Sequence, residues 1–305
     1  MALSLRQIQY FIASAEAGKL SLAASQLGVS QSAVTEAIQA LEQETGVALL
    51  HRHAKGIELT FEGNQFLRHA RAVVTAVSDA TQAPRQARSG VAGSFSLAMT
   101  FTVAGYFLPA PLARFRRILP DVQVNLFEMD RADIERQLVA GKIDLAVILT
   151  SNLSNTEQIE SEELIRSRRR LWAPPNHPLL QARRATLAEI APEPYIMLTV
   201  DEADKTAMRY WKRTRYRPNV AFRTSSVEAV RSMVATGAGV SILSDMVYRP
   251  WSLEGDRIAA RTIHDAVPSM DVGLAWKRES HLNPCAQAFR DFCHNTYNAS
   301  GGELA

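Results

Sequence analysis

Side chains suited to specific hydrogen bonding gather near the start of the chain. Ser32, Thr35, Glu36 and Gln39 are spaced i, i+3, i+4, i+7, so all four share one face of any helix that contains them. A row of hydroxyl, amide and carboxylate groups can donate to and accept from base edges in the major groove of DNA. The predicted chemistry is therefore recognition of a nucleic acid by hydrogen bonding.

Two short amphipathic helices joined by a tight turn are needed to present this row. The apolar residues at helical spacing are Leu20, Ala23, Ala24 and Leu27 before the turn, and Val34, Ala37, Ile38 and Leu41 after it. Gly28 breaks the first helix, and Ser30 is a suitable N-cap for the second. This is the pattern of a helix-turn-helix, whose second helix lies in the major groove. The same pattern also occurs in folds that do not bind DNA, so the flanking residues must decide.

The flanking segments favour DNA binding. An apolar stripe predicts a helix that packs over the pair, with Leu5, Ile8, Ile12 and Ala15 on its buried face. After the pair, residues 49–60 predict two short strands that turn near Gly56. Such a hairpin is a wing, and Arg52 and Lys55 on it could reach phosphates or a minor groove.

Together these residues resemble the N-terminal domain of the LysR-type transcriptional regulators. The matching residues, in order and without a gap, are Leu5-Arg6-Gln7, Tyr10-Phe11, Ala23-Ala24, Leu27, Val29-Ser30-Gln31-Ser32-Ala33-Val34, Ile38, Leu41-Glu42, Gly46, Leu49-Leu50, Arg52, Leu59-Thr60 and Glu62-Gly63. The rest of the chain fits the effector domain of this family more loosely.

The resemblance implies a fold in three parts. Residues 1–60 would form a winged helix-turn-helix DNA-binding domain with mainly α structure, and residues 61–92 a long linker helix for dimerisation followed by a hinge. Residues 93–305 would form an α/β effector domain of two doubly wound lobes, similar to the periplasmic binding proteins. Lobe 1 would span about 93–165 and 266–300, and lobe 2 about 166–265.

The resemblance also implies a function. It is sequence-specific regulation of transcription by a homotetramer, a dimer of dimers, on a dyad-symmetric operator in double-stranded DNA. A small-molecule effector would modulate this binding, and RNA polymerase is a further candidate partner.

The predicted DNA contacts lie on the second helix and on the wing: Gln31, Ser32, Thr35, Glu36, Gln39, Arg52 and Lys55. Relatives usually carry a basic or amide residue early in this helix, where this chain has Glu36 and Ala37. Residues 1–59 hold four basic and five acidic side chains, so the net charge of +3 for the whole chain hides a DNA-binding domain that is not basic. Attraction to phosphates is the main sequence-independent source of DNA affinity. A single domain should bind weakly, and avidity in a dimer must supply the rest.

The linker carries an apolar stripe with alternating spacings of four and three, typical of a coiled coil: Phe66, Ala70, Val73, Val77 and Ala80. We expect this stripe to pair with its copy in a second subunit, because nothing in its own chain would cover it. The alternative is a helix packed on its own effector domain. Pro84 is expected to end the helix, and residues 81–93 to form the hinge.

Strands and helices alternate beyond Gly93, which predicts mainly parallel sheets with helices on both faces. In such sheets ligands bind at the carboxyl ends of strands. The residues predicted at those ends to contact an effector are Thr100, Thr102, Arg131, Thr150, Thr199, Thr224 and Ser225. Arg131 could hold a carboxylate with two hydrogen bonds, which favours an anionic effector. The alternatives are helix capping for the hydroxyls, and pairing of Arg131 with Asp130 or Asp133.

The basic run from Arg166 to Arg170 stands where relatives usually have apolar strand residues. A solvated edge strand, an anion-facing wall of the cleft and a subunit contact all remain open.

Other classes of function lack their motifs. No GxSxG, HExxH, P-loop or GxGxxG motif is present, and Gly237-Ala238-Gly239 follows a predicted helix, the wrong order for a dinucleotide loop, so no enzyme and no cofactor are predicted. Cys285, Cys293 and the seven histidines show no metal-ligand spacing, so no metal is expected and the cysteines are interpreted as packing residues.

The hydropathy of the sequence predicts the cellular location of the protein. No run approaches the ~20 apolar residues of a membrane span, and the first residues form an amphipathic helix instead of a signal peptide, so a cytoplasmic protein without membrane contact is expected. A small-molecule binding protein of transport type is a weaker alternative, because it needs export and leaves residues 1–90 unexplained. A DNA-binding regulator that does not respond to any effector remains the second alternative.

Overall fold

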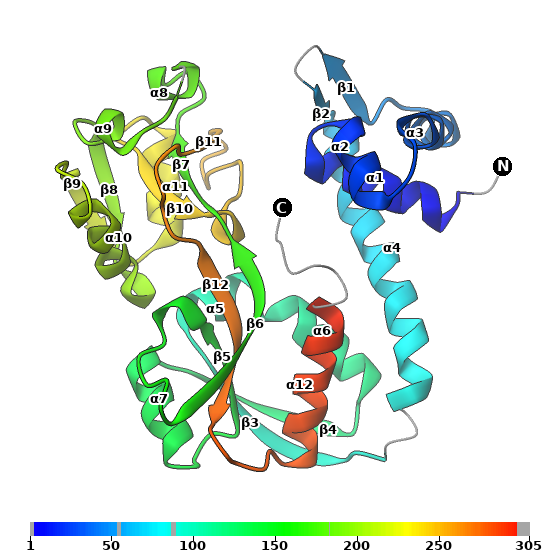
Figure 1. Cartoon of the computed structure of the whole chain (residues 1–305), viewed down its shortest axis with the longest axis vertical. Helices are drawn as coiled ribbons and strands as arrows, with labels where there is room; N and C mark the ends of the chain where they lie inside the picture. The colour runs from blue at the N-terminus through cyan, green and yellow to red at the C-terminus, as the bar shows by residue number, and fades with distance from the viewer. Residues whose placement is uncertain (1–2, 54–55, 87–89, 183, 298–305) are drawn as a thin grey trace. The chain divides into compact units, whose positions relative to one another are not determined.

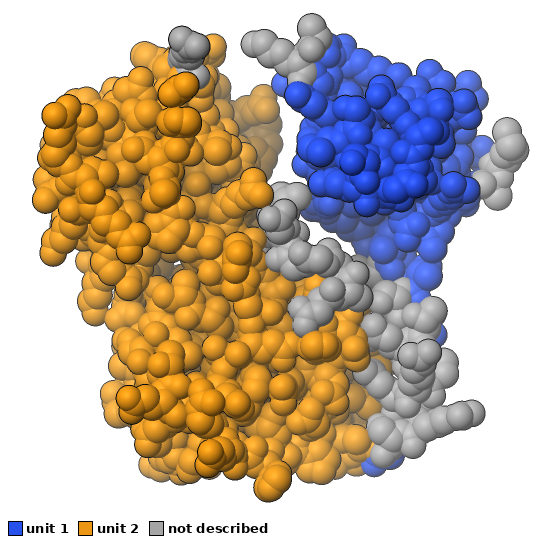
Figure 2. Space-filling view, in the orientation of Figure 1, with its two compact units in different colours: residues 1–90, 305 blue, residues 91–304 orange. Residues whose placement is uncertain are grey.

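The computed structural model describes residues 3–53, 56–86, 90–182 and 184–297, and the chain divides after Gly90 into two compact units (Figures 1 and 2). No helix among these residues is long and apolar enough to cross a membrane.

The first unit contains the predicted winged helix-turn-helix. Its elements are α1 (Leu5–Ala17), α2 (Leu20–Leu27), α3 (Gln31–Thr45), β1 (Leu50–His53), β2 (Gly56–Leu59) and α4 (Phe61–Gln86). Gly28 ends α2 in the left-handed conformation with φ 65°, and the Ser30 hydroxyl accepts from the amide of Ala33 at 3.2 Å to cap α3. The turn between the two helices is therefore built by the residues expected from the sequence.

The wing is fixed to the helices by backbone contacts. β1 and β2 form an antiparallel hairpin, and the amide of Ile57 donates to the carbonyl of Gly18 at 2.9 Å. A Cβ atom at Gly56 would lie 2.4 Å from that carbonyl oxygen, so only glycine fits there. At the other end of the hairpin, the Glu42 carboxylate accepts from the amides of Leu49 and Leu50. The wing therefore has a defined position relative to α3.

Helix α4 is longer than expected. It runs through Pro84 to Gln86, so residues 81–86 are helical and do not belong to a hinge, while residues 87–89 lie outside the described residues. The expectation that Pro84 ends the helix was wrong. Proline removes one amide donor but can keep a helical backbone, and only two helical residues follow it here.

The second unit consists of two lobes, each with its own sheets (Figure 1). Lobe 1 has the strand order β4-β3-β5-β12-β6. Its strands are β3 (Gly93–Met99), β4 (Val122–Glu128), β5 (Leu145–Leu149), β6 (Ile159–Ser167) and β12 (Met270–Lys277). Its helices are α5 (Phe101–Tyr106), α6 (Pro109–Ile118), α7 (Arg131–Val139) and α12 (Pro284–Tyr297), with the short η2 (Thr150–Asn152) after β5.

Lobe 2 has the strand orders β10-β7-β11 and β8-β9, linked by a bridge between Tyr195 and Val240. Its strands are β7 (Arg169–Ala173), β8 (Pro194–Leu198), β9 (Asn219–Thr224), β10 (Ser241–Ser244) and β11 (Ala259–Thr262). Its helices are α8 (Pro178–Gln181), α9 (Leu187–Ile190), α10 (Ala203–Lys212) and α11 (Val227–Ala235), with the short η3 (Val200–Glu202) and η4 (Asp245–Val247).

The chain crosses between the lobes twice, from β6 to β7 and from β11 back to β12. The predicted two-lobed α/β fold is confirmed, but the sheets are mixed and not mainly parallel. β12 runs antiparallel to both β5 and β6, and β7 runs antiparallel to β10 and β11, because the crossing strands enter each sheet against the direction of the others.

Aromatic packing fixes the core of lobe 1. Phe95, Phe115 and Phe289 stack with ring centroids 4.9–6.3 Å apart, which ties β3, α6 and the C-terminal α12 together. Cys285 and Cys293 are buried on α12 and carry free thiols. Burial raises the pKa of both thiols, as suits residues that only pack.

Candidate nucleic-acid and effector sites

The polar face of α3 is exposed. Gln31, Ser32, Glu36 and Gln39 are all solvent-accessible, whereas Val34, Ile38 and Leu41 are buried on the other side. The hydroxyl of Thr35 donates to the carbonyl of Gln31 at 2.8 Å. Since that hydrogen is used within the helix, the methyl group of Thr35 is what it offers a base. The surface therefore combines amide, carboxylate and methyl groups.

The wing adds one described cation to this surface. Arg52 is exposed on β1, opposite Ile57 of β2. Nε2 of His53 lies 3.6 Å from a carboxylate oxygen of Glu58 across the hairpin. Lys55, the second predicted wing contact, lies outside the described residues.

The apolar stripe of α4 has two parts. Phe66 meets Phe11 edge to face with centroids 5.2 Å apart, and Ala70 is buried in the same core. Val73 and Val77 are 42% and 41% exposed, and Ala80 is also exposed. The assignment of Phe66 and Ala70 to a contact between subunits is therefore corrected: α1 of the same chain covers the first turns of α4. Of the predicted stripe, Val73, Val77 and Ala80 are left exposed by the described residues of this unit.

The predicted effector residues of the second unit do not meet in one cavity. The Thr150 hydroxyl donates to the carbonyl of Asp271 at 3.2 Å, and the Thr224 hydroxyl accepts from the amide of Ser226 at 3.1 Å, so both serve local structure. Thr100 is 2% exposed, and its hydroxyl has no hydrogen-bond partner among the described residues. The remaining four residues are divided between two spaces.

The first space is an open groove between the lobes, of about 720 Å³. Arg131, Thr199 and Ser225 line it. Its acidic lining residues are Glu128, Asp130, Asp133, Asp201, Glu202 and Asp204. Its basic ones are Arg131 and Lys205, and both bind Glu202. The groove is therefore strongly acidic.

Arg131 is occupied by carboxylates of its own chain. Its guanidinium donates to Glu202 at 2.8 and 3.2 Å and to Glu135 at 2.6 Å. These bonds raise the pKa of Arg131 and lower that of Glu202 to about 2. The partners are neither Asp130 nor Asp133, and the bidentate contact predicted for an effector is made inside the protein. The prediction that Arg131 receives the effector is corrected accordingly.

A pH prediction follows from Glu202. Since folding lowers its pKa from 4.5 to about 2, the ion pair stabilises the fold fully above pH 4.5 and is lost as the pH falls towards 2. We expect a Glu202→Gln variant to lose less stability than the parent over this acid range, and to show the same pH dependence as the parent between pH 6 and 8. Thermal unfolding at a series of pH values measures both. A parallel loss of stability in parent and variant below pH 4 would contradict the assigned pair.

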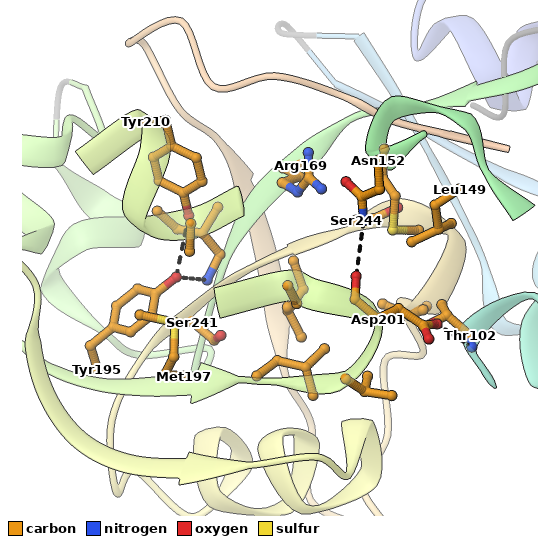
Figure 3. Close-up of a pocket in the computed structure, with 18 residues that line it drawn as sticks. Thr102, Leu149, Asn152, Arg169, Tyr195, Met197, Asp201, Tyr210, Ser241 and Ser244 are labelled. Carbon is orange, nitrogen blue, oxygen red and sulfur yellow. Dashed lines mark hydrogen bonds between the residues drawn. The ribbon is translucent and has the colours of Figure 1, made fainter. Parts of the chain in front are cut away.

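The second space is a small, partly open cavity of about 30 Å³, also between the lobes (Figure 3). Its polar lining comprises Thr102, Asn152, Arg169, Tyr195, Asp201, Tyr210, Ser241 and Ser244. Arg169 is the only cation and Asp201 the only carboxylate among its lining residues. Thr102 is the one predicted effector residue that lines it.

Arg169 contacts both segments that cross between the lobes. It begins β7, directly after the first crossing, and its guanidinium donates to the carbonyl of Pro268 at 2.6 Å on the returning segment. Burial lowers the pKa of this arginine, so its charge is incompletely solvated. The basic run is thus divided: Arg169 lines the cavity, Arg170 pairs with Asp245, and Arg166 pairs with Glu163.

The tyrosines opposite Arg169 are neutral donors and acceptors. Their hydroxyls lie 3.5 Å apart, and that of Tyr195 accepts from the amide of Ile242 at 3.1 Å. Burial raises the pKa of both Tyr195 and Tyr210, so they remain protonated. The sequence-based prediction missed them because they lie on different elements, β8 and α10, and meet only in the folded lobe. The one available signal was the unusual basic run that contains Arg169.

No group of three or more His, Cys, Asp or Glu side chains in the described part of the chain is arranged to hold a metal ion. The described contacts of the cavity and the groove are hydrogen bonds and ion pairs.

Two family models match the chain. Residues 5–64 match the bacterial regulatory helix-turn-helix protein of the lysR family, and residues 88–298 match the LysR substrate binding domain. The transcriptional regulator YnfL of Escherichia coli K12 is 30% identical over 296 residues, which cover 95% of this chain and 97% of the relative. A probable regulator of Synechococcus elongatus, LrrA, is 30% identical over 295 residues, covering 96% and 97%.

Solved structures agree over the full length. The LysR family regulator HinK of Pseudomonas aeruginosa is similar with a TM-score of 0.62 and 26% identity, covering 97% of this chain and 99% of that one. Full-length CbnR in complex with its target DNA is similar with a TM-score of 0.54 and 26% identity, covering 96% and 99%.

Proposed function

Because the chain belongs to the LysR family of transcriptional regulators, we propose that a small carboxylate bound beside Arg169 controls how it occupies its operator. The protein is a DNA-binding regulator with an effector-binding domain. We further propose which residues bind the DNA, how the subunits assemble and to which chemical class the effector belongs.

The operator contacts follow from the exposed face of α3. Gln31 and Gln39 would bind base edges, Ser32 and Thr35 would add a hydroxyl and a methyl contact, and Glu36 would lie at the margin. Arg52 and Lys55 would contact the backbone or a minor groove. The exposed stripe from Val73 to Ala80 would join two subunits, and two such dimers on a dyad-symmetric site would compensate for a DNA-binding domain that is not basic.

The single observation behind the effector class is the environment of Arg169. It is the only cation among the described residues that line the cavity, burial lowers its pKa, and its neighbours Tyr195 and Tyr210 are neutral. A carboxylate would restore the interactions that burial removes from the guanidinium, and the hydroxyls could donate to its second oxygen. Arg131 offers no such opportunity, since Glu202 and Glu135 already hold it.

An acid bound beside Arg169 would affect the contacts between the lobes. Arg169 begins β7 after the first crossing, and its guanidinium donates to the segment that returns to lobe 1. An anion bound to this guanidinium would therefore alter contacts at both crossings. A cavity of about 30 Å³ holds only a few water molecules, so a metabolite would bind a more open arrangement of the lobes. A ligand that prefers one arrangement shifts the balance towards it.

The test uses a panel of small aliphatic and aromatic carboxylic acids, screened by thermal shift on the full chain. We expect at least one acid to raise the Tm, and Arg169→Gln to weaken its binding about 10- to 100-fold, as for a lost hydrogen bond to a charged group. Arg168→Gln is the matched control, since Arg168 is exposed and does not line the cavity.

Three results would contradict the proposal or favour its alternatives. Unchanged affinity in Arg169→Gln would place the acid elsewhere. A cationic or neutral effector that binds with Arg169 intact would refute the carboxylate class. Operator binding that responds to no member of a broad metabolite panel would favour a regulator without an effector.

We also propose where in the cell the protein acts and that it does not catalyse a reaction. The named relatives are transcriptional regulators, and we infer that this chain works as one in the cytoplasm, where the DNA is, with RNA polymerase as a further partner and without catalysis.

A further inference from the structure

One turn of lobe 2 lies between the small cavity and the open groove. It comprises residues 199–202, between β8 and α10, and includes η3. Val200 and Asp201 line both spaces. Figure 3 shows Asp201 at the cavity with Asn152 and Thr102 near it. We call residues 199–202 the strap.

The strap is held by three separate elements of lobe 1. The Asp201 carboxylate accepts from the amide of Thr102 at 2.6 Å, at the start of α5. The Asp201 carbonyl accepts from the side-chain amide of Asn152 at 2.9 Å, in η2. Glu202 accepts two hydrogen bonds from Arg131 of α7. Two adjacent residues of one lobe therefore bind three places on the other.

The backbone of the strap is strained where these contacts are made. Asp201 has φ 49° and Glu202 has φ 61°, and both are in the left-handed region that residues other than glycine rarely adopt. Such a conformation is energetically costly and persists only where the surroundings hold it. Here the contacts to Thr102 and Arg131 hold it. The strained backbone of the strap is therefore maintained by its contacts with lobe 1.

Arg131 is held in position on lobe 1 by Glu135. Glu135 binds Arg131 and also accepts from the amides of Ser154 and Asn155 at 3.0 and 3.2 Å. The guanidinium thus stands at a set position on lobe 1, where Glu202 of lobe 2 binds it.

We propose that the strap is a latch, in which Asp201 and Glu202 together hold lobe 2 against lobe 1 beside the cavity and thereby set the concentration at which an effector acts. Asp201 is an internal ligand of lobe 1, and an effector must bind well enough to offset its release. The apparent affinity for the effector is its affinity for the open state multiplied by the fraction of molecules in that state. Asp201 and Glu202 are positioning residues, and the inference rests on the proposed effector cavity.

The experiment measures the latch without any effector. Hydrogen–deuterium exchange of the full-length protein follows the amide of Thr102, which Asp201 protects. Asp201→Asn removes the charge but keeps a side chain that tolerates the left-handed region. It should speed exchange at Thr102 about tenfold. The decisive variant is Glu202→Gln, because Glu202 accepts from Arg131 and not from Thr102, yet a shared latch requires faster exchange at Thr102, by about threefold or more after allowing for solvent screening.

Asp204→Asn is the matched control. Asp204 also lines the groove and carries the same charge, but it forms an ion pair with Arg223 of its own lobe, at 3.8 Å. Exchange at Thr102 should stay at the parental rate in this variant.

Each pattern of exchange rates at Thr102 either supports or overturns the latch. Faster exchange in Asp201→Asn and Glu202→Gln, with parental exchange in Asp204→Asn, supports the latch. Parental exchange in Glu202→Gln overturns it, because the two contacts are then independent. Equal acceleration in all three overturns it as well, since loss of any charge would suffice. If the exchange results support the latch but no carboxylic acid binds, the latch stands and the proposed effector class is refuted.

Discussion

The Val73→Asp variant is expected to lose its dimer and, with it, measurable operator binding. Val73 is 42% exposed on a face of α4 that the described part of its own unit does not cover, so the substitution leaves the fold of the monomer intact. At a contact between subunits, the same carboxylate would be buried without a partner, which costs several kcal/mol and weakens dimerisation about 100-fold or more. Sedimentation measures the assembly, and binding of labelled operator DNA measures the loss of avidity.

Its control lies one residue away. Ala72 is exposed on a different face of α4, so Ala72→Asp introduces the same charge outside the proposed seam. This variant should remain dimeric and bind the operator. A dimeric Val73→Asp protein would refute the seam, and a monomeric Ala72→Asp protein would show that the helix tolerates no charge there.

The Gln31→Ala variant is expected to lose discrimination at one base pair of each half-site. Gln31 is exposed in the first turn of α3, and a glutamine amide can bind adenine through two hydrogen bonds. Such a contact contributes about 1–3 kcal/mol, so the preference for the correct base should fall roughly 5- to 150-fold. Binding to operators with each base substituted in turn measures this preference.

Arg52→Ala provides the contrast on the wing. Because we propose that Arg52, exposed on the wing, contacts phosphate, its loss should weaken binding to all sequences alike and reduce the salt dependence by about one ion. Equal loss of affinity for every operator variant in Gln31→Ala would mean that Gln31 supports the helix or the backbone and does not read a base.

Local patterns predicted the DNA-binding unit well. Ser30, Gly28 and the apolar stripes act within a few residues of one another, and the structure has the expected helices and hairpin. The stripe on α4 was harder to interpret. A helical period predicts that Phe66 and Val73 share a face, but it cannot tell that α1 covers one end of this face and leaves the other exposed.

The effector site shows the same limit more strongly. Thr102 was identified from its place after a strand, and it does line the small cavity. Arg131 was identified by the same rule, but Glu202, 71 residues away, takes its hydrogen bonds. A carboxylate that reaches an arginine from the other lobe leaves no trace in the spacing around either residue.

The sequence by itself determined the helix-turn-helix and the succession of strands and helices, because capping, periodicity and strand alternation are local properties. The family and the two-lobed architecture followed from the resemblance of its residues to the LysR-type regulators. Only the tertiary structure decided which charges are available. It neutralised Arg131, placed a half-buried Arg169 at the crossing between the lobes, and placed Asp201 against the amide of Thr102. Charges interact through space over several ångströms, so their partners depend on how distant segments pack and not on their order in the chain.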